Sequence, residues 1–141
     1  MQGRMESPSR SGVPRSGAPL LDRLRRALES LDLDAFAELF AEGAVLEEVS
    51  SLSPPSHPTV VQGREAIGKR LRRDALEDPI SGWTRQLQRC LVEDALETPE
   101  GLAFTEVRIY AAGDRVIAQH LCRTSEGRID KDRMVVVWDA D

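Results

Sequence analysis

The sequence predicts an α+β domain in which a curved antiparallel β-sheet wraps around three N-terminal helices to form a cone. Two observations predict this class. Apolar residues recur at helical spacing in three segments of the N-terminal half. The C-terminal half holds four strand-like segments separated by short turn signals, which is typical of a four-stranded meander. A chain of 141 residues has the size of one domain, which we place at 19–141.

The three helices are predicted from their apolar stripes and their end signals. Pro19 suits the first turn of a helix with the stripe Leu20, Leu24, Ala27, Leu28 and Leu31. Asp32 can cap a second helix, which has the stripe Leu33, Phe36, Ala37 and Phe40 and which Gly43 is expected to end. A third helix begins at Arg64 and continues through Ile67, Leu71 and Ala75. Asp78, Pro79, Ser81 and Gly82 are expected to break it.

The strands are predicted from alternation between turn signals. A short first strand, Ala44 to Glu48, leads into a loop rich in proline and serine that continues to Val60. The meander strands are expected at about 84–96, 102–111, 115–124 and 128–138. If Gly113-Asp114 and Glu126-Gly127 are two-residue turns, Gln119 lies opposite both Arg108 and Met134.

Composition narrows the class of protein. Residues 1–18 contain little to bury and are expected to be a disordered tail. There is no long apolar run, so we expect a soluble, cytoplasmic protein with no membrane partner. The net charge of −5 argues against nucleic acid as the main partner. Cys90 and Cys122 are expected to be reduced and packed. The basic residues are almost all arginine and asparagine is absent, which suggests a GC-rich bacterial genome.

The order of these elements resembles a known family. The chain resembles the NTF2-like superfamily in the order of its elements. That order is a helix, a glycine, a strand with an acidic end, a loop, the run Gly63-Arg64-Glu65-Ala66-Ile67, a helix and a β-meander. The resemblance is strongest to its SnoaL-like and ketosteroid-isomerase-like branch and covers about residues 20–138. It implies a conical pocket and often a homodimer formed through the outer face of the sheet.

The resemblance also decides which face of the sheet is expected to line the pocket. Pattern alone allows either face, because one is large and partly charged and the other is small and mostly β-branched. Alignment on Ala103-Phe104-Thr105 and Gln119-His120 implies that the first face looks inward. The expected substrate-binding residues are Phe104, Glu106, Arg108, Tyr110, Asp132, Met134 and, from the loop, His57. On this assignment His120 falls on the outer, dimer-forming face.

The resemblance implies a candidate base as well. In the isomerase branch a carboxylate after the first strand removes a proton beside a carbonyl, and that position falls on Glu48. The tyrosine of that branch falls on Leu24, which cannot donate a hydrogen bond, and its aspartate falls on Gln119. We therefore expect Glu48 and Gln119 as the catalytic residues and do not expect steroid-type isomerisation.

Plainer interpretations of the same residues stay open. Glu47 and Glu48 can be surface acids at a strand end, and Glu106 with Arg108 can be an exposed ion pair. His57 can be a solvated loop residue, and His120 a packing residue. Lys69, Arg70, Arg72 and Arg73 can hold an anion, although we favour a solvated helix face.

Two functions follow as hypotheses. The sequence has no metal-ligand spacing, no phosphate-binding glycine loop and no G-x-S-x-G motif, so no cofactor and no metal are expected. The first hypothesis is a SnoaL-like enzyme, acting as a cyclase, isomerase or hydrolase on a small, mainly apolar metabolite. The second is a non-catalytic module that binds a ligand or dimerises.

Overall fold

The structure is a computed structural model that describes residues 19–76, 86–111 and 113–139. The predicted tail over 1–18, the first residues of the strand predicted from 84 and the helix break predicted at Asp78, Pro79, Ser81 and Gly82 lie outside these residues. The helices are α1 (Leu20–Glu29), α2 (Leu33–Ala37) and α3 (Arg64–Leu76). The strands are β1 (Phe40–Val49), β2 (Thr59–Gln62), β3 (Leu87–Thr98), β4 (Gly101–Tyr110), β5 (Arg115–Ser125) and β6 (Arg128–Asp139).

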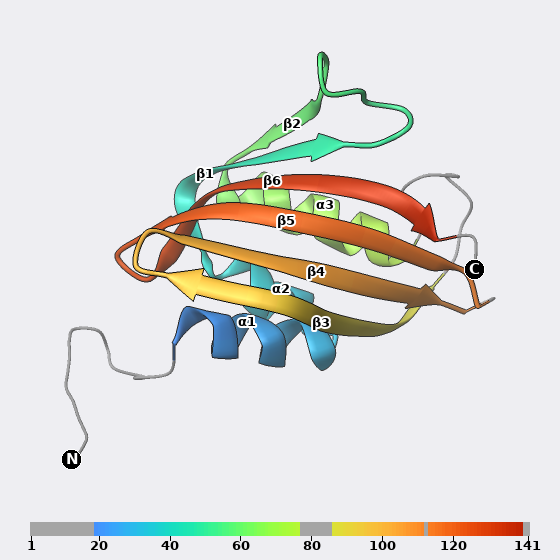
Figure 1. Ribbon diagram of the computed structural model, residues 1–141, viewed down its shortest axis with the longest axis horizontal. Helices are drawn as coiled ribbons and strands as arrows, with labels where there is room; N and C mark the ends of the chain where they lie inside the picture. Colours follow the sequence, from blue (N-terminus) through green and yellow to red (C-terminus); the bar gives the residue numbers. More distant parts are fainter. Residues whose placement is uncertain (1–18, 77–85, 112, 140–141) are drawn as a thin grey trace.

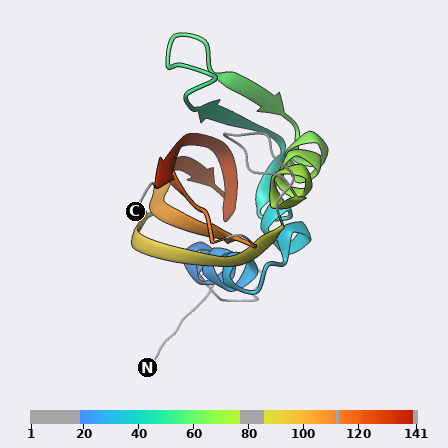
Figure 2. The same ribbon diagram turned by 90° about the vertical axis from the view of Figure 1, so that its right-hand side faces the viewer.

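The described part has the predicted α+β architecture, a curved sheet that bends around the helices. Its six strands run in the order β2-β1-β6-β5-β4-β3. Figure 1 shows the long meander β3 to β6, and Figure 2 shows the curvature of the sheet with the helices on its concave side. We call the face toward the helices the inner face.

The sheet differs from the prediction in one pairing. The meander is antiparallel, as predicted, but β1 runs parallel to β6. The prediction of a wholly antiparallel sheet is therefore wrong for the pairing of β1 with β6. The hairpin rule does not apply there, because β1 and β6 are far apart in the chain and a long connection can join strands of either direction. A further short strand, β2, pairs with β1 where the loop was expected to end.

The helices begin as predicted, but α2 ends early. Asp32 caps α2 by accepting a hydrogen bond from the amide of Ala35 at 3.0 Å. The helix stops at Ala37, and Gly43 lies inside β1, so the prediction that Gly43 ends the helix is wrong. Tertiary pairing overrides the helical stripe, because Phe40 pairs with Ile129 of β6 and a bulge follows before Val45.

The core lies between the inner face and the helices. It includes the apolar stripe residues Leu20, Leu24, Leu28, Phe36, Phe40, Ile67 and Leu71. The edge strand β3 is held by α1, because Arg25 donates to the carbonyl oxygen of Val92 and Glu29 accepts from its amide. Within the described residues, no helix combines the length and the apolar character needed to cross a membrane.

Candidate functional site

The inner face of the meander carries most of the predicted site residues. Along β4, Phe104, Glu106, Arg108 and Tyr110 are buried, and along β6, Asp132 and Met134 are buried. The register places Glu48 of β1 beside Met134. The structure thus buries seven of the predicted residues, which are Glu48, Phe104, Glu106, Arg108, Tyr110, Asp132 and Met134. Their roles stay predictions.

The face assigned to β5 is wrong, because the register differs from the prediction toward both β4 and β6. Ile109 pairs with Arg115, so the β4–β5 loop is longer than the predicted two-residue turn. The β5–β6 turn is the predicted one, with Ser125 opposite Arg128, but an irregularity between Arg123 and Thr124 shifts the register by one residue. A shift by one residue moves every side chain of a strand to the other face.

The corrected register exchanges a glutamine for a histidine. Gln119 is exposed on the outer face, and His120 is buried on the inner face opposite Phe104 and Met134. The aligned position of Gln119 therefore does not reach the interior. His57 also lies apart, because it is exposed in the β1–β2 loop, where its Nδ1 contacts the hydroxyl of Ser56.

Four buried charged residues form one chain across β6, β5 and β4, which we call the sheet cluster: Asp132, His120, Glu106 and Arg108. His120 Nδ1 lies 2.7 Å from Asp132 Oδ2, and Nε2 lies 2.8 Å from Glu106 Oε1. Arg108 donates from Nε at 2.9 Å and from Nη2 at 3.2 Å to the two oxygens of Glu106. When both carboxyl groups are ionised their oxygens only accept, so each ring nitrogen of His120 must then carry a proton.

Opposite charges within the sheet cluster shift the pKa values of Glu106 and His120. Burial alone would raise the pKa of Glu106, but Arg108 and then His120 outweigh burial and hold the pKa well below its ordinary value. Burial alone would lower the pKa of His120, but Asp132 and then Glu106 raise it to about 9. Glu106 and Arg108 therefore stay ionised as a pair, and His120 stays protonated, near neutral pH. The interpretation of Glu106 and Arg108 as an exposed pair is wrong.

An aromatic ring and a thiol also contact the sheet cluster. The ring of Phe104 stacks on the ring of His120 with centroids 4.2 Å apart. Cys90 donates through its thiol to Glu106 at 3.3 Å. Both cysteines are free and buried, as predicted, and burial raises the pKa of each thiol. They are therefore packed groups rather than nucleophiles.

A second group of charges joins β1 to α3, and we call it the helix cluster: the buried acids Glu48 and Asp74 with the less buried Arg70 and Arg73. Arg70 Nη2 donates to Glu48 Oε1 at 2.7 Å, and its Nε lies 3.6 Å from Asp74 Oδ1. Arg73, a half-exposed side chain, donates to the same Asp74 oxygen at 3.2 Å. Glu48 is only 2% exposed, so it is not a surface acid.

Glu48 is held less firmly in its ionised form than Glu106. Burial raises the pKa of Glu48 above its ordinary value, Arg70 partly opposes that shift, and Asp74 adds to it. Asp74 Oδ2 and Arg70 Nε have no hydrogen-bond partner among the described residues. Two buried carboxylates thus share the guanidinium of Arg70, which is the kind of environment that brings a carboxyl pKa toward neutral pH.

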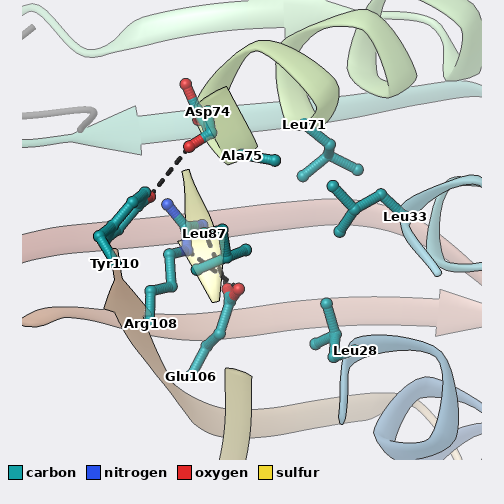
Figure 3. A pocket seen from close by; sticks show the side chains of 9 residues that line it. All are labelled: Leu28, Leu33, Leu71, Asp74, Ala75, Leu87, Glu106, Arg108 and Tyr110. Carbon is teal, nitrogen blue, oxygen red and sulfur yellow. Dashed lines mark hydrogen bonds and ion pairs between the residues drawn. The ribbon is translucent and has the colours of Figure 1, made fainter. Parts of the chain in front are cut away.

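A small cavity lies where α1, α2 and α3 face β3 and β4 (Figure 3). Its volume of about 10 Å³ is room for about one water molecule. Glu106, Arg108, Tyr110 and Leu87 line it from the sheet, and the helices contribute Leu28, Leu33, Leu71, Asp74 and Ala75. Tyr110 donates its hydroxyl proton to the carbonyl oxygen of Asp74 at 3.0 Å, which ties β4 to the end of α3.

The sequence contained signals for the residues that the prediction missed. Asp74 extends the apolar stripe of Ile67 and Leu71 by one turn, and an acid on a buried stripe needs a partner. Arg70 lies four residues before Asp74, the spacing of a helical ion pair. The solvated-face interpretation of the basic cluster therefore fails for Arg70 and fits the exposed Lys69, Arg72 and Arg73.

Comparison with known proteins adds information on the fold. No family model and no curated protein sequence matches the chain. Among solved structures, an NTF2-like protein of unknown function from Mesorhizobium loti is 21% identical, with 83% of this chain and 87% of that chain covered and a TM-score of 0.64. An NTF-2-like protein of unknown function from Burkholderia xenovorans is 13% identical, with coverage of 86% and 83% and a TM-score of 0.65.

Two further neighbours carry more specific descriptions. A putative ketosteroid isomerase from Kribbella flavida is 15% identical, with coverage of 86% and 76% and a TM-score of 0.61. A protein with a ketosteroid isomerase-like fold from Catenulispora acidiphila, in complex with trimethylamine, is 19% identical, with coverage of 82% of both chains and a TM-score of 0.55. Likeness at these identities establishes the fold and leaves activity open. The chain therefore has the NTF2-like fold that ketosteroid-isomerase-like proteins share.

Proposed function

We propose that the protein is a small-molecule enzyme of the acid/base type, in which Glu48 carries the proton. The substrate would be a small, mainly apolar metabolite, and the reaction an isomerisation, a cyclisation or a hydrolysis. Arg70 and Asp74 would set the proton affinity of Glu48. The proposal departs from the isomerase branch, because Leu24 replaces its tyrosine and Gln119 is exposed on the outer face.

The observation that carries the proposal is the environment of Glu48. Its carboxylate is buried, it shares the guanidinium of Arg70 with Asp74, and its pKa is raised mainly by burial. A general base works best when its pKa lies near the operating pH. A buried carboxylate whose hydrogen-bonded cation is shared with Asp74 fits that requirement better than Glu106, which two cations hold ionised.

One observation favours a second candidate, a binding module without catalysis. The cavity beside Arg108 holds about one water molecule, so a substrate needs the surrounding side chains to move. A module that binds a small ligand or a protein does not need Glu48 to transfer a proton. The trimethylamine complex of the Catenulispora protein supports small-molecule binding by this fold without supporting a reaction.

A screen with a matched pair of variants tests the proposal. The screen offers wild type a panel of small enones, enolisable ketones, epoxides and lactones, and product is followed by mass spectrometry. Any turnover is then measured for Glu48→Gln and for Glu47→Gln. Glu47 is the control, because it is the next residue and pairs with Arg133 outside the helix cluster.

The outcomes separate the two candidates. The proposal expects Glu48→Gln to lose about 100-fold or more in kcat and Glu47→Gln to stay near wild type. Full turnover by Glu48→Gln would remove the proposed base. Saturable binding without turnover anywhere in the panel favours the binding module.

We also propose that two copies associate through the outer face of the sheet. That face exposes Leu121 (65%), Val137 (47%) and Val135 (36%), and apolar side chains gathered on one face favour burial against a partner. Sedimentation should give a dimer for wild type and a monomer for Leu121→Lys. A wild-type monomer at high concentration would contradict this proposal.

We propose the bacterial cytoplasm as the compartment of the protein. Its two free, buried thiols fit that reducing environment.

A further inference from the structure

Two buried polar atoms of opposite kind belong to residues that line the small cavity. Arg108 lines it from β4 and Asp74 lines it from the end of α3. Arg108 Nη1 is a donor and Asp74 Oδ2 is an acceptor, and neither atom has a hydrogen-bond partner among the described residues. The two side chains are only 4% and 5% exposed. Each atom therefore needs a partner inside the protein, because an unpaired buried charged group costs stability.

The other polar atoms of both side chains are already engaged. Arg108 donates from Nε and Nη2 to the two oxygens of Glu106. Asp74 Oδ1 accepts from Arg73 and lies 3.6 Å from Nε of Arg70. Figure 3 shows Asp74 above the end of the Arg108 side chain, with Tyr110 beside them. The free nitrogen and the free oxygen therefore cannot turn toward these partners and must find another one at the cavity.

The charges of Arg108 and Asp74 act on one another in this part of the core. Burial alone would lower the pKa of Arg108, but Glu106 outweighs burial, and Tyr110 and Asp74 add to the rise. Burial raises the pKa of Tyr110 to about 12, so its hydroxyl keeps its proton near neutral pH. A donor, an acceptor and a neutral hydroxyl thus surround the cavity.

The polarity of the two free atoms decides which ligand can satisfy both. A metal ion or an ammonium ion has no lone pair with which to accept from Arg108 Nη1. A halide ion has no proton to donate to Asp74 Oδ2. The ligand must both accept and donate, and the volume of about 10 Å³ has room for about one water molecule. Water is the molecule of that size with both capacities.

The tyrosine supplies a third partner for such a molecule. Tyr110 donates its proton to the carbonyl oxygen of Asp74 at 3.0 Å, so the lone pairs of its hydroxyl are left to accept. Buried waters make about three hydrogen bonds on average. The apolar residues of the lining, which include Leu28, Leu33 and Leu71, offer none. The bonds of a water molecule in this cavity are therefore directed to Arg108, Asp74 and Tyr110.

We propose that the cavity binds one fixed water molecule, which accepts a hydrogen bond from Arg108 Nη1 and donates one to Asp74 Oδ2 and one to the hydroxyl of Tyr110. This water joins the sheet cluster to the helix cluster. The inference goes beyond the proposed function, because the water is a structural link and needs no proton transfer at Glu48.

The link changes how the end of α3 is held on the sheet. The bond from Tyr110 reaches only the backbone oxygen of Asp74. The water adds a hold on the Asp74 carboxyl group itself, and it comes from an arginine that Glu106 fixes at two points. With Oδ2 held in this way, Oδ1 stays directed toward Arg70.

A crystal structure of the wild-type chain at about 1.5 Å resolution tests the water directly. We expect one density peak in the cavity, about 2.7–3.2 Å from both Arg108 Nη1 and Asp74 Oδ2. A second crystal is soaked in rubidium chloride, since rubidium has nearly the size of potassium and ammonium and gives an anomalous signal. A cavity without density, direct contact between the two side-chain atoms, or a rubidium signal in the cavity would overturn the proposal.

A double-mutant cycle in urea tests the link in solution. Arg108→Lys keeps a positive charge for Glu106 but loses the free nitrogen, and Asp74→Leu removes the acceptor. Because lysine keeps the charge, direct attraction to Asp74 contributes little to the difference between the two rows of the cycle. Once either partner of the water is gone, loss of the second costs less. We expect the double variant to change the unfolding equilibrium constant about tenfold less than the product of the single effects.

The matched control is the cycle of Arg133→Lys with Asp74→Leu. Arg133 is a half-buried arginine that pairs with Glu47 and does not line the cavity. Its effect should multiply with that of Asp74→Leu to within about twofold. Circular dichroism identifies the variants that fold, and the crystal test needs wild type alone if one does not. Independent effects of Arg108→Lys and Asp74→Leu in folded variants would contradict the link.

Discussion

The sheet cluster and the helix cluster bury the same kinds of charged side chain and hold them differently. In the sheet cluster, both nitrogens of His120 are bonded to carboxylates on the two neighbouring strands, and both oxygens of Glu106 are bonded to Arg108 on the same strand. In the helix cluster, Glu48 depends on Arg70, a partly exposed side chain that also serves Asp74. A carboxylate with several fixed partners is locked as an anion, whereas a buried carboxylate with one shared partner can change its protonation.

Substitution of His120 should give the largest effect. His120→Leu leaves Glu106 and Asp132 facing each other across a buried apolar side chain, which should cost about 3–5 kcal/mol of unfolding free energy. Urea unfolding measures it, with His57→Leu as a control near zero because His57 is exposed. A loss below about 1 kcal/mol for His120→Leu would show that the sheet cluster is not locked.

The pH dependence of stability should give the next effect. The folded pKa of His120 is raised to about 9, above its ordinary 6.5, so its contribution is complete below 6.5 and is lost as pH rises through 9. The expected decrease in unfolding free energy between pH 6 and pH 9 is about 3 kcal/mol. Stability that is flat or rising over that range would contradict a doubly protonated His120.

Neutralisation of Glu48 should change stability much less. Burial already works against its charged form, and the amide of Glu48→Gln can still accept from Arg70, so we expect a change within about 1 kcal/mol at pH 8. Glu47→Gln serves as the control in the same urea experiment. A loss as large as that of His120→Leu would mean that the two clusters are held alike.

Removal of Arg73 should have the smallest effect. Arg73→Ala deletes a half-exposed partner of Asp74, and such pairs contribute about 0.5 kcal/mol or less. The comparison variant is Arg72→Ala, which removes an exposed pair with Asp34. If the urea midpoints of unfolding of the two variants cannot be distinguished, Arg73 contributes no more to stability than an exposed ion pair does.

The fold was predictable because local signals and long-range pairing agree over most of the chain. The cap at Asp32 and the tight turn at Glu126-Gly127 are local, and both are found. Positive φ angles at both turn residues, 53° and 75°, explain why glycine occupies the second position. The early end of α2 was not predictable, because it depends on pairing between Phe40 and Ile129.

The site was predictable on β4 and β6 and not on β5. Alternation gives the members of each face, but it does not give the register between strands. The shift between Arg123 and Thr124 has no clear signal in the sequence, and it alone moves His120 inward and Gln119 outward relative to β6. Arg70 and Asp74 were visible as a helical pair, and their partner Glu48 became apparent only when β1 was placed beside α3.

A carboxyl-carbon NMR titration of Glu48 and Glu106 in one sample tests the difference between the clusters most directly. The expected result is two shifts of opposite sign, with the midpoint of Glu48 above 4.5 and that of Glu106 below it. Equal midpoints, or a midpoint of Glu48 below 4.5, would contradict the division into a locked cluster and a titratable one. The case for Glu48 as the proton carrier would then be lost.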